Sequence, residues 1–442
     1  MATTGCAGIA NSVTVAASPS PVPTSPLAIP DYRRFWIARF FSVVATSGMV
    51  VILGYQLYDV ARSDYGMSIA QAAFQLGLLG LAQFLPLFLL TPIAGVVADR
   101  FDRRNVAGLS ICLDCTIALA LAIATQTGAL SLPLLFGLAA LHGTARVFIG
   151  PALSSIAPNI VPAELMPKAI AINSMAWQTG AVGGPAIAGM LFAGHPALPY
   201  WTSTALLMLS AFCVFGIRRL PPPPGNRDSH PVRQIREGLS FVWNDRFLLG
   251  CVTLDLFAVL MGGATALLPV FARDILTVNG HAVGADGLGL MRAMPGVGAA
   301  LVAFVLARRP IANNVGVKML IGVAIYGAFT IGFGLSTNYY LSLLMLAGVG
   351  AGDMVSVFIR STLVQLHTPD DVRGRVSSIS GLAISASNEL GEMQSGVAAA
   401  LLGAIGAVAF GGIGAIAVTA IWFFAFPELK NARTFAARYR TA

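Results

Sequence analysis

The stretch LLGLAQFLPLFLLTPIAGVVA, residues 78–98, carries no charged side chain, and DRFDRR, residues 99–104, follows it at once. A helix needs about 20 consecutive apolar residues to cross the hydrocarbon core of a bilayer. The apolar run therefore predicts a transmembrane helix. The charged residues predict the loop that leaves the membrane after it.

The whole chain has the composition of an integral membrane protein. Of its 442 residues 56% are hydrophobic and only 10% are charged, whereas soluble domains carry about 25% charged residues. Continuous apolar runs favour helices over the alternating pattern of a β-barrel. We expect an all-α membrane protein with twelve transmembrane helices, near 35–60, 73–98, 106–126, 132–156, 169–193, 199–217, 247–272, 286–307, 317–337, 339–366, 376–402 and 405–426.

A Pro-rich and then basic segment, residues 220–246, divides these spans into six-helix bundles at 32–219 and 247–428. It predicts a cytoplasmic linker in which a polyproline spacer precedes an amphipathic interfacial helix. Residues 1–31 contain no Lys or Arg, so they lack the basic part of a signal peptide and predict a disordered tail. Residues 429–442 predict a short cytoplasmic tail.

The two halves resemble each other in sequence. GLLGLAQFLP (77–86) aligns with DGLGLMRAMP (286–295), and VPAELMPKAIAI (161–172) aligns with TPDDVRGRVSSI (368–379) at a nearly equal offset. Together with six spans in each half, the two matches predict an internal duplication that makes the bundles pseudo-symmetric. Alternating-access transporters are built from such repeats.

The basic residues predict the orientation. If the N-terminus is cytoplasmic, most of the 27 lysines and arginines fall on the cytoplasmic side, and only Arg62 and Arg273 fall on the other side. The positive-inside rule then places both termini in the cytoplasm, for a protein of the bacterial cytoplasmic (inner) membrane. The net charge of +8 is explained by topology, so no nucleic-acid partner is expected.

The loop after residue 98 holds a recognisable pattern. Gly95, Asp99, Arg100, Arg103 and Arg104 form G-x-x-x-D-R-x-x-R-R, which resembles the signature loop of the major facilitator superfamily. The resemblance extends over essentially the whole chain. It implies two six-helix bundles that alternate access to a central cavity, with this loop latching the halves on the cytoplasmic side.

We expect the arginines of the loop to pair with Glu164, or with Asp370 and Asp371. A plain positive-inside loop is the alternative, which explains the arginines but not the interleaved aspartates. The equivalent position in the second half has Phe304 for the glycine and Arg308 for the aspartate. A latch on one half only is therefore expected.

Two further patterns resemble motifs of the superfamily. Arg146 and Gly150 resemble a buried-arginine motif linked to proton coupling. GAVGGPAIAG, 180–189, resembles the G-x-x-x-G-P signature of exporters, and its smooth glycine face predicts close packing against the span 286–307. Ordinary small-residue packing is the alternative for these positions: Gly180, Gly184, Pro185 and Gly189. The segments DYRRFWIARFFS (31–42) and NELGEMQSG (388–396) look most like the branch with enterobactin and macrolide exporters.

Ten charged residues fall inside predicted spans. Each Asp, Lys or Arg at a helix centre disfavours insertion by roughly 2.5–3.5 kcal/mol, so these residues are expected to face a polar cavity or one another. Arg39 and Arg360 lie near span ends, where snorkelling is the alternative. His142 is expected to make a hydrogen-bonded helix contact, with a proton carrier as the alternative, and Trp177 is expected to be a packing residue, with stacking on the substrate as the alternative. The predicted substrate cavity contains Arg39, Asn173, Asp255, Arg292 and Asp353.

Glu389 and Glu392 are three residues apart and therefore share one helix face. Two carboxylates so close together in a low-dielectric cavity repel each other, so one of them is expected to hold a proton. We predict that Glu389 or Glu392 carries the coupling proton. Arg146 or Arg292 would be its positive partner.

These residues predict a secondary active exporter of a small organic molecule, siderophore-like or an amphipathic drug, driven by proton antiport. Uptake of a metabolite by proton symport is the first alternative, and a membrane sensor or scaffold is the second. An enzyme is not expected, because no nucleophile–base pair or phosphate loop is evident. Cys112 and Cys115 form a C-x-x-C in mid-span without further ligands. No metal or other cofactor is expected, and the predicted partners of the monomer are its substrate, protons and the lipid bilayer.

Overall fold

The computed structural model describes residues 25–220, 231–369 and 372–435. The predicted spacer around 221–230, residues 1–24 of the N-terminal tail and residues 436–442 of the C-terminal tail lie outside this part of the chain.

The first half is a bundle of long helices. A 3₁₀ turn, η1 (Pro26–Ala28), precedes them, and short loops join them, one of which contains a second 3₁₀ turn, η2 (Ala163–Leu165). The helices are α1 (Pro30–Ser63), α2 (Ile69–Arg100), α3 (Arg103–Gln126), α4 (Leu132–Ile160), α5 (Met166–Gly194) and α6 (Leu198–Phe215).

The second half repeats this arrangement after the linker. Helix α7 (Pro231–Asn244) stands where the amphipathic interfacial helix is predicted. The elements that follow are α8 (Arg246–Met261), η3 (Ala264–Leu267), α9 (Leu268–Val270), η4 (Phe271–Ile275), β1 (Thr277–Val278), β2 (His281–Ala282), α10 (Gly284–Arg308), α11 (Val315–Leu335), α12 (Tyr339–Leu366), α13 (Arg373–Ala425) and α14 (Pro427–Lys430).

The all-α membrane fold is confirmed. Within the described residues ten helical segments are long and apolar enough to cross a membrane. Helix α5, with 29 residues, lies beside α1 and is not among those ten. Helix α13 contains two of the predicted spans, joined at Gly403, whose φ of 73° suits glycine and few other residues. The described chain thus has ten to twelve crossing segments.

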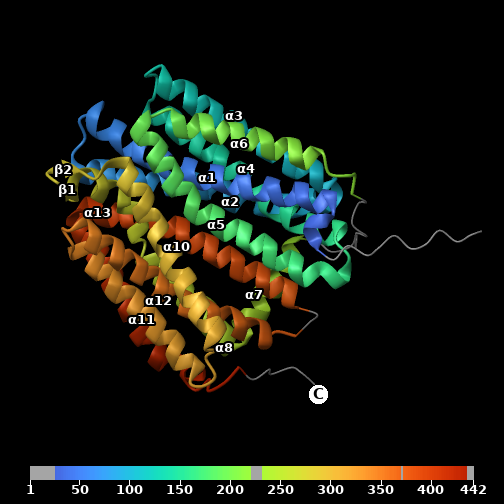
Figure 1. The fold of residues 1–442 in the computed structure, drawn as a ribbon. Coiled ribbons are helices and arrows are strands. Elements are labelled where there is room, and N and C mark those ends of the chain that lie inside the picture. Colours follow the sequence, from blue (N-terminus) through green and yellow to red (C-terminus); the bar gives the residue numbers. More distant parts are fainter. Residues whose placement is uncertain (1–24, 221–230, 370–371, 436–442) are drawn as a thin grey trace, which may run out of the picture.

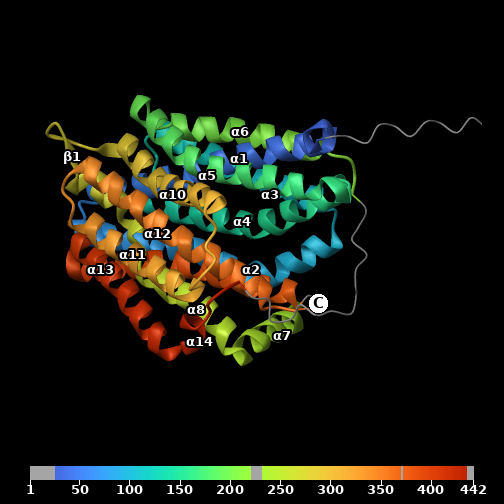
Figure 2. The same cartoon turned by 60° about the horizontal axis from the view of Figure 1, so that its bottom comes forward.

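The two halves lie side by side, with the first half in blue to green and the second in yellow to red (Figures 1 and 2). The β1–β2 hairpin marks one end of the molecule, which we call the hairpin end. Its turn is Asn279–Gly280, and both residues have positive φ, as a two-residue hairpin of this type requires. The opposite end carries the start of α1, helix α7 and the C-terminal helix α14, and we call it the terminal end.

Local sequence signals set the helix boundaries near the charged loop. Helix α2 ends at Arg100, and α3 begins at Arg103 because the side chain of Asp102 accepts a hydrogen bond from the backbone N–H of Arg104 at 3.0 Å. A carboxylate at this N-cap position satisfies a donor that the helix leaves free. One of the interleaved aspartates is therefore a helix cap.

One predicted span is broken in the structure. The sequence predicts a continuous helix over 247–272, but α8 ends at Met261 and only short turns follow it. Gly262 and Gly263 lower the helix propensity at the break. Tyr326 stabilises it, because its hydroxyl donates to the carbonyl oxygen of Gly262 at 2.8 Å.

The halves touch through paired glycines on the hairpin side of the bundle. A Cβ at Gly77 of α2 would lie 2.9 Å from Cα of Gly396 on α13. A Cβ at Gly189 of α5 would lie 2.5 Å from the carbonyl oxygen of Ala285 on α10, beside Gly289. Absence of side chains at these positions permits the close approach of helices from opposite halves.

Candidate functional site

A polar cavity of about 540 Å³ lies between the two halves. Both halves contribute to its lining, through α1, α2, α4 and α5 on one side and α8, α10, α11, α12 and α13 on the other. Its charged residues are Arg146, Arg292, Asp353, Glu389 and Glu392. All five stand among the predicted site residues, and the fold brings them together from four helices.

An ion pair joins the halves inside this cavity. Nη1 of Arg146 on α4 donates to Oε1 of Glu389 on α13 at 2.8 Å. The Glu389 side chain is 9% exposed and that of Arg146 is 42% exposed, so the carboxylate is buried and the guanidinium faces the open space. A charge-assisted hydrogen bond in such surroundings is among the stronger polar contacts in a protein.

Glu392 lies one helical turn beyond Glu389 on the same face of α13 and also lines the cavity. It packs against Gly80 of α2, where an added Cβ would lie 2.8 Å from Cβ of Glu392. Gly80 therefore makes room for this carboxylate. Arg292 of α10 and Asp353 of α12 line the same cavity.

A second polar pair adjoins the cavity. The sequence analysis expected His142 to make a hydrogen-bonded helix contact but did not identify its partner. His142, one turn before Arg146 on α4, lines the cavity, and its Nδ1 lies 2.9 Å from Oδ1 of Asp114 on α3. The side chains are 3% and 0% exposed. Oδ2 of Asp114 has no hydrogen-bond partner in the described structure. The sequence signal that places His142 at the cavity is its four-residue spacing from Arg146, which puts both residues on one face of a helix.

The broken span supplies backbone to the same cavity. Gly262, Gly263 and Thr265 line it, next to Tyr326. Irregular backbone at membrane depth is tolerated where it borders a polar cavity, and discontinuous helices commonly form transporter binding sites. Trp177 of α5 also lines the cavity and is 47% exposed, so its expected role as a packing residue is corrected.

Three predicted cavity residues lie elsewhere. Arg39 and Asn173 are not part of the cavity lining, and their Nε and Oδ1 atoms are buried without a hydrogen-bond partner in the described structure. Asp255 forms an ion pair with Arg360 in a second pocket, one helical turn from the cavity lining. Asp255 precedes the cavity residue Val259 by one turn, and helical spacing alone does not say at which turn a cavity ends.

A cluster of charged side chains holds the halves together at the hairpin end. Oη of Tyr58 on α1 donates to Oδ2 of Asp274 in η4 at 2.5 Å, and Arg62 lies 3.6 Å from the same carboxylate. Nε of Arg273 lies 2.8 Å from Oδ1 of Asp59, and its Nη2 donates to Ser63 at 2.7 Å. We call these six residues the hairpin-end cluster.

The hairpin-end cluster was missed by the sequence analysis. The sequence signal for this cluster is the position of Arg62 and Arg273, the two arginines that the predicted topology places on the non-cytoplasmic side. They lie far apart in sequence, so only the tertiary structure shows that each pairs with an aspartate of the other half.

Comparison with known proteins decides the family. Residues 22–440 match a family described as transmembrane secretion effectors. The chain belongs to this family, and so to the major facilitator superfamily. It is 28% identical to the enterobactin exporter EntS of Citrobacter koseri over 382 residues, which cover 85% of each chain. EntS of Escherichia coli O127:H6 matches at the same identity and coverage.

Solved structures of superfamily transporters share the fold. A POT family transporter in complex with 5-aminolevulinic acid superposes with a TM-score of 0.71 at 14% identity, covering 90% of this chain and 96% of that chain. A bacterial homologue of the lysosomal transporter Spinster, in an inward-facing and occupied conformation, gives 0.70 at 15% identity, with 95% and 100% covered. The protein is therefore a membrane-embedded efflux transporter of the superfamily and not an enzyme.

The signature loop of the superfamily makes contacts within its own half. Arg103 donates to the carbonyl oxygen of Ser155 at 3.2 Å, and Arg104 donates to that of Ile217 at 2.9 Å. The predicted pairing with Glu164 is not among the ion pairs of the described residues, and Asp370 and Asp371 lie outside the described residues.

Helix α2 includes Gly95, Asp99 and Arg100, but the side chain of Asp99 is not part of the described structure. In the second half, the guanidinium of Arg308 lies 3.9 Å from the ring centroid of Phe304. That position holds a cation–π contact in place of a second latch.

The exporter-type glycines of the superfamily contact two different helices. A Cβ at Gly180 would lie 2.9 Å from Cγ1 of Val43, and one at Gly184 would lie 2.5 Å from the carbonyl oxygen of Val44, so both pack against α1. Gly189 and the backbone of Pro185 pack against α10, the helix to which the sequence analysis assigned the whole face. Pro185 lies inside α5 and lines the cavity.

Proposed function

We propose that the protein exports a small amphipathic organic molecule across the bacterial inner membrane by proton antiport with alternating access. As a monomer, it would use its two halves as the moving parts and the cavity around Arg146, Glu389 and Glu392 as the binding site. The terminal end, rich in Lys and Arg, would face the cytoplasm.

The ion pair between Arg146 and Glu389 carries this proposal. It connects α4 of one half to α13 of the other in the central cavity, over 2.8 Å. Protonation of Glu389 would remove the negative charge and weaken the contact between the halves. A proton would thus bind the two conformations with different affinity, which is the condition for shifting the equilibrium between them.

The conformation supports alternating access. The described ion pairs that join the halves are Arg146–Glu389 and those of the hairpin-end cluster. Ion pairs at the terminal end, such as Arg246–Glu428 and Arg218–Asp31, stay within one half. If the terminal end faces the cytoplasm, this state would be closed to the outside and would bind its cargo from the cytoplasmic side.

The cargo is proposed from the cavity and from the similarity to EntS. Arg146 and Arg292 offer hydrogen-bond donors to acidic or catechol oxygens, while Trp177 and Tyr326 offer aromatic surface. Enterobactin is therefore the first candidate to test, and a macrolide is the second.

The test is pH-gradient-driven transport of enterobactin into inverted proteoliposomes. We expect Glu389→Gln and Glu392→Gln to reduce gradient-driven transport at least tenfold, with Glu164→Gln, on an exposed turn, as the matched control. Full coupling in both glutamine variants would overturn proton antiport through these residues. Uptake into right-side-out vesicles with the proton would instead establish symport.

A further inference from the structure

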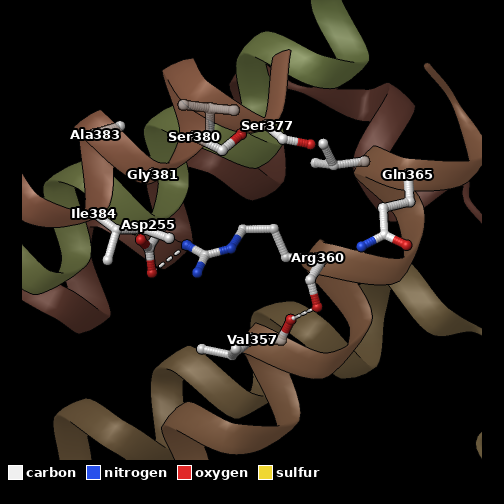
Figure 3. Close-up of a pocket in the computed structure, with 12 residues that line it drawn as sticks. Asp255, Val357, Arg360, Gln365, Ser377, Ser380, Gly381, Ala383 and Ile384 are labelled. Carbon is white, nitrogen blue, oxygen red and sulfur yellow. Dashed lines mark hydrogen bonds and ion pairs between the residues drawn. The ribbon is translucent and has the colours of Figure 1, made fainter. Parts of the chain in front are cut away.

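A second pocket, of about 230 Å³, opens among α8, α12 and α13 in the second half. Figure 3 shows Arg360 extended across it toward Asp255, with Ser377 and Ser380 on the opposite wall. Nη1 of Arg360 and Oδ1 of Asp255 form an ion pair, and the two side chains are 8% and 9% exposed.

This pocket continues the central cavity toward the terminal end. On α12, Asp353 lines the cavity and Val357, one turn on, lines the pocket. The same four-residue step relates Val259 to Asp255 on α8, and Asn388 to Ile384 on α13. Three helices therefore line both the pocket and the cavity. A ligand could pass from the pocket to the cavity by moving about one helical turn, roughly 5 Å.

The ion pair defines what the pocket can bind. Asp255 neutralises Arg360, so the floor of the pocket has no net charge but still presents guanidinium N–H donors and carboxylate acceptors. Oγ of Ser380 is buried without a hydrogen-bond partner in the described structure. The remaining walls are mainly apolar and include Val252, Val364 and Ala383. A neutral group that both donates and accepts hydrogen bonds, attached to an apolar body, fits these surroundings.

The volume of the pocket limits the size of the group that can bind in it. Sites for whole drug-sized ligands occupy about 300–1,000 Å³, and this pocket is smaller. We infer that it is an access site on the transport route, which binds the uncharged hydroxyl-bearing aromatic end of the cargo before the molecule enters the central cavity. The inference rests on the proposed function for the direction of travel, but binding to the pocket is measurable without transport.

Gly381 provides a direct way to fill the pocket. It lines the pocket on α13, and a Cβ added there meets nothing within 4 Å. Leucine at this position would project into the open space without displacing backbone. Gly374 on the same helix is equally unobstructed and does not line the pocket, so Gly374→Leu is the matched control.

The experiment combines binding and transport. Binding of 4-fluorocatechol to purified protein in nanodiscs is followed by fluorine NMR, in a Glu389→Gln background to reduce binding at the central cavity. We expect Gly381→Leu to weaken this binding at least tenfold and Gly374→Leu to leave it unchanged. In the wild-type background, Gly381→Leu should raise the KM of enterobactin transport several-fold with little change in kcat.

A second variant tests the chemistry of the site. Asp255→Asn leaves Arg360 without its counter-ion, so selectivity should move from 4-fluorocatechol toward the anionic probe 4-fluorobenzoate. The inference is overturned if Gly381→Leu binds 4-fluorocatechol as tightly as the control or leaves the KM unchanged. Gly381-dependent binding in a protein that transports neither enterobactin nor a macrolide would instead overturn the proposed function and leave the binding site in place.

Discussion

The two ends of the molecule use charged residues in opposite ways. At the hairpin end, Arg62 and Asp59 of α1 pair with Asp274 and Arg273 of the other half. At the terminal end, Arg103 and Arg104 bond to backbone carbonyls of their own half. The end with fewer charges is therefore the one where ion pairs close the molecule, and abundance of arginine does not identify a gate.

This contrast also separates topology from gating. In the proposed orientation, basic residues at the terminal end would satisfy the positive-inside rule without needing a partner across the halves. A gate needs complementary charges on opposing surfaces, and the hairpin-end cluster provides them. Four substitutions test this difference between the two ends. The width of the hairpin end can be measured as the distance between spin labels at the exposed residues Thr127 and His281. The labels are attached in a background from which the five native cysteines have been removed.

Gly189→Leu should have the largest effect. The new side chain would collide with the backbone of Ala285 on α10, and overpacking of this kind costs about 3 kcal/mol. We expect the hairpin end to open, with longer label distances and loss of transport. Gly183→Leu on the same helix meets nothing within 4 Å and should leave the distances unchanged. Similar distances for the two variants would refute the role assigned to this crossing.

Asp274→Ala should have the next largest effect. It removes the acceptor shared by Tyr58 and Arg62, and loss of hydrogen bonds to a charged group costs about 2 kcal/mol. The closed hairpin end should lose population in the same label measurement. Asp64→Asn, an exposed aspartate at the same end, is the control. If the distance distribution of Asp274→Ala equals that of the control, the cluster is not a gate.

Arg103→Gln should act on one half alone. It removes the hydrogen bond to Ser155, which contributes about 1 kcal/mol to the free energy of unfolding. A loss of this size lowers the Tm by about 2–4 °C in a domain of this size. The label distances at the hairpin end should stay as in the wild type, and Lys168→Gln should change neither quantity. A change in those distances without a change in Tm would contradict the difference between the ends.

Arg308→Gln should have the smallest effect. It removes the cation–π contact with Phe304 at the second-half position, worth about 0.5–1 kcal/mol at an exposed site. Transport should remain within about twofold of the wild type, as measured in proteoliposomes with Phe304→Leu as the partner variant. A loss of transport as severe as that of Gly189→Leu would show that the second half does contain a latch.

Much of the site could be predicted from charge alone. Arg146, Arg292, Asp353, Glu389 and Glu392 are costly in lipid, and the structure places all of them in one cavity. Asp255, which the sequence analysis placed in the substrate cavity, instead pairs with Arg360 in a second pocket, and this is the other outcome that the cost of burial allows. Because burial of a charge is costly, a charged residue in a span needs an ion-pair partner or water. The sequence does not show which of the two the residue has.

Apolar run length, the distribution of basic residues and the internal repeat were enough to determine a membrane protein of two helical halves, because these signals are local and additive along the chain. Tertiary structure alone decided the partners, since Arg146 and Glu389 are 243 residues apart and Tyr58 and Asp274 are 216 residues apart. Periodicity shows which residues share one face of a helix, but the rotation of that face relative to its neighbours depends on close contacts such as Gly189 against Gly289. Those contacts form only when distant segments meet, and they place the cavity and the closed end where they are.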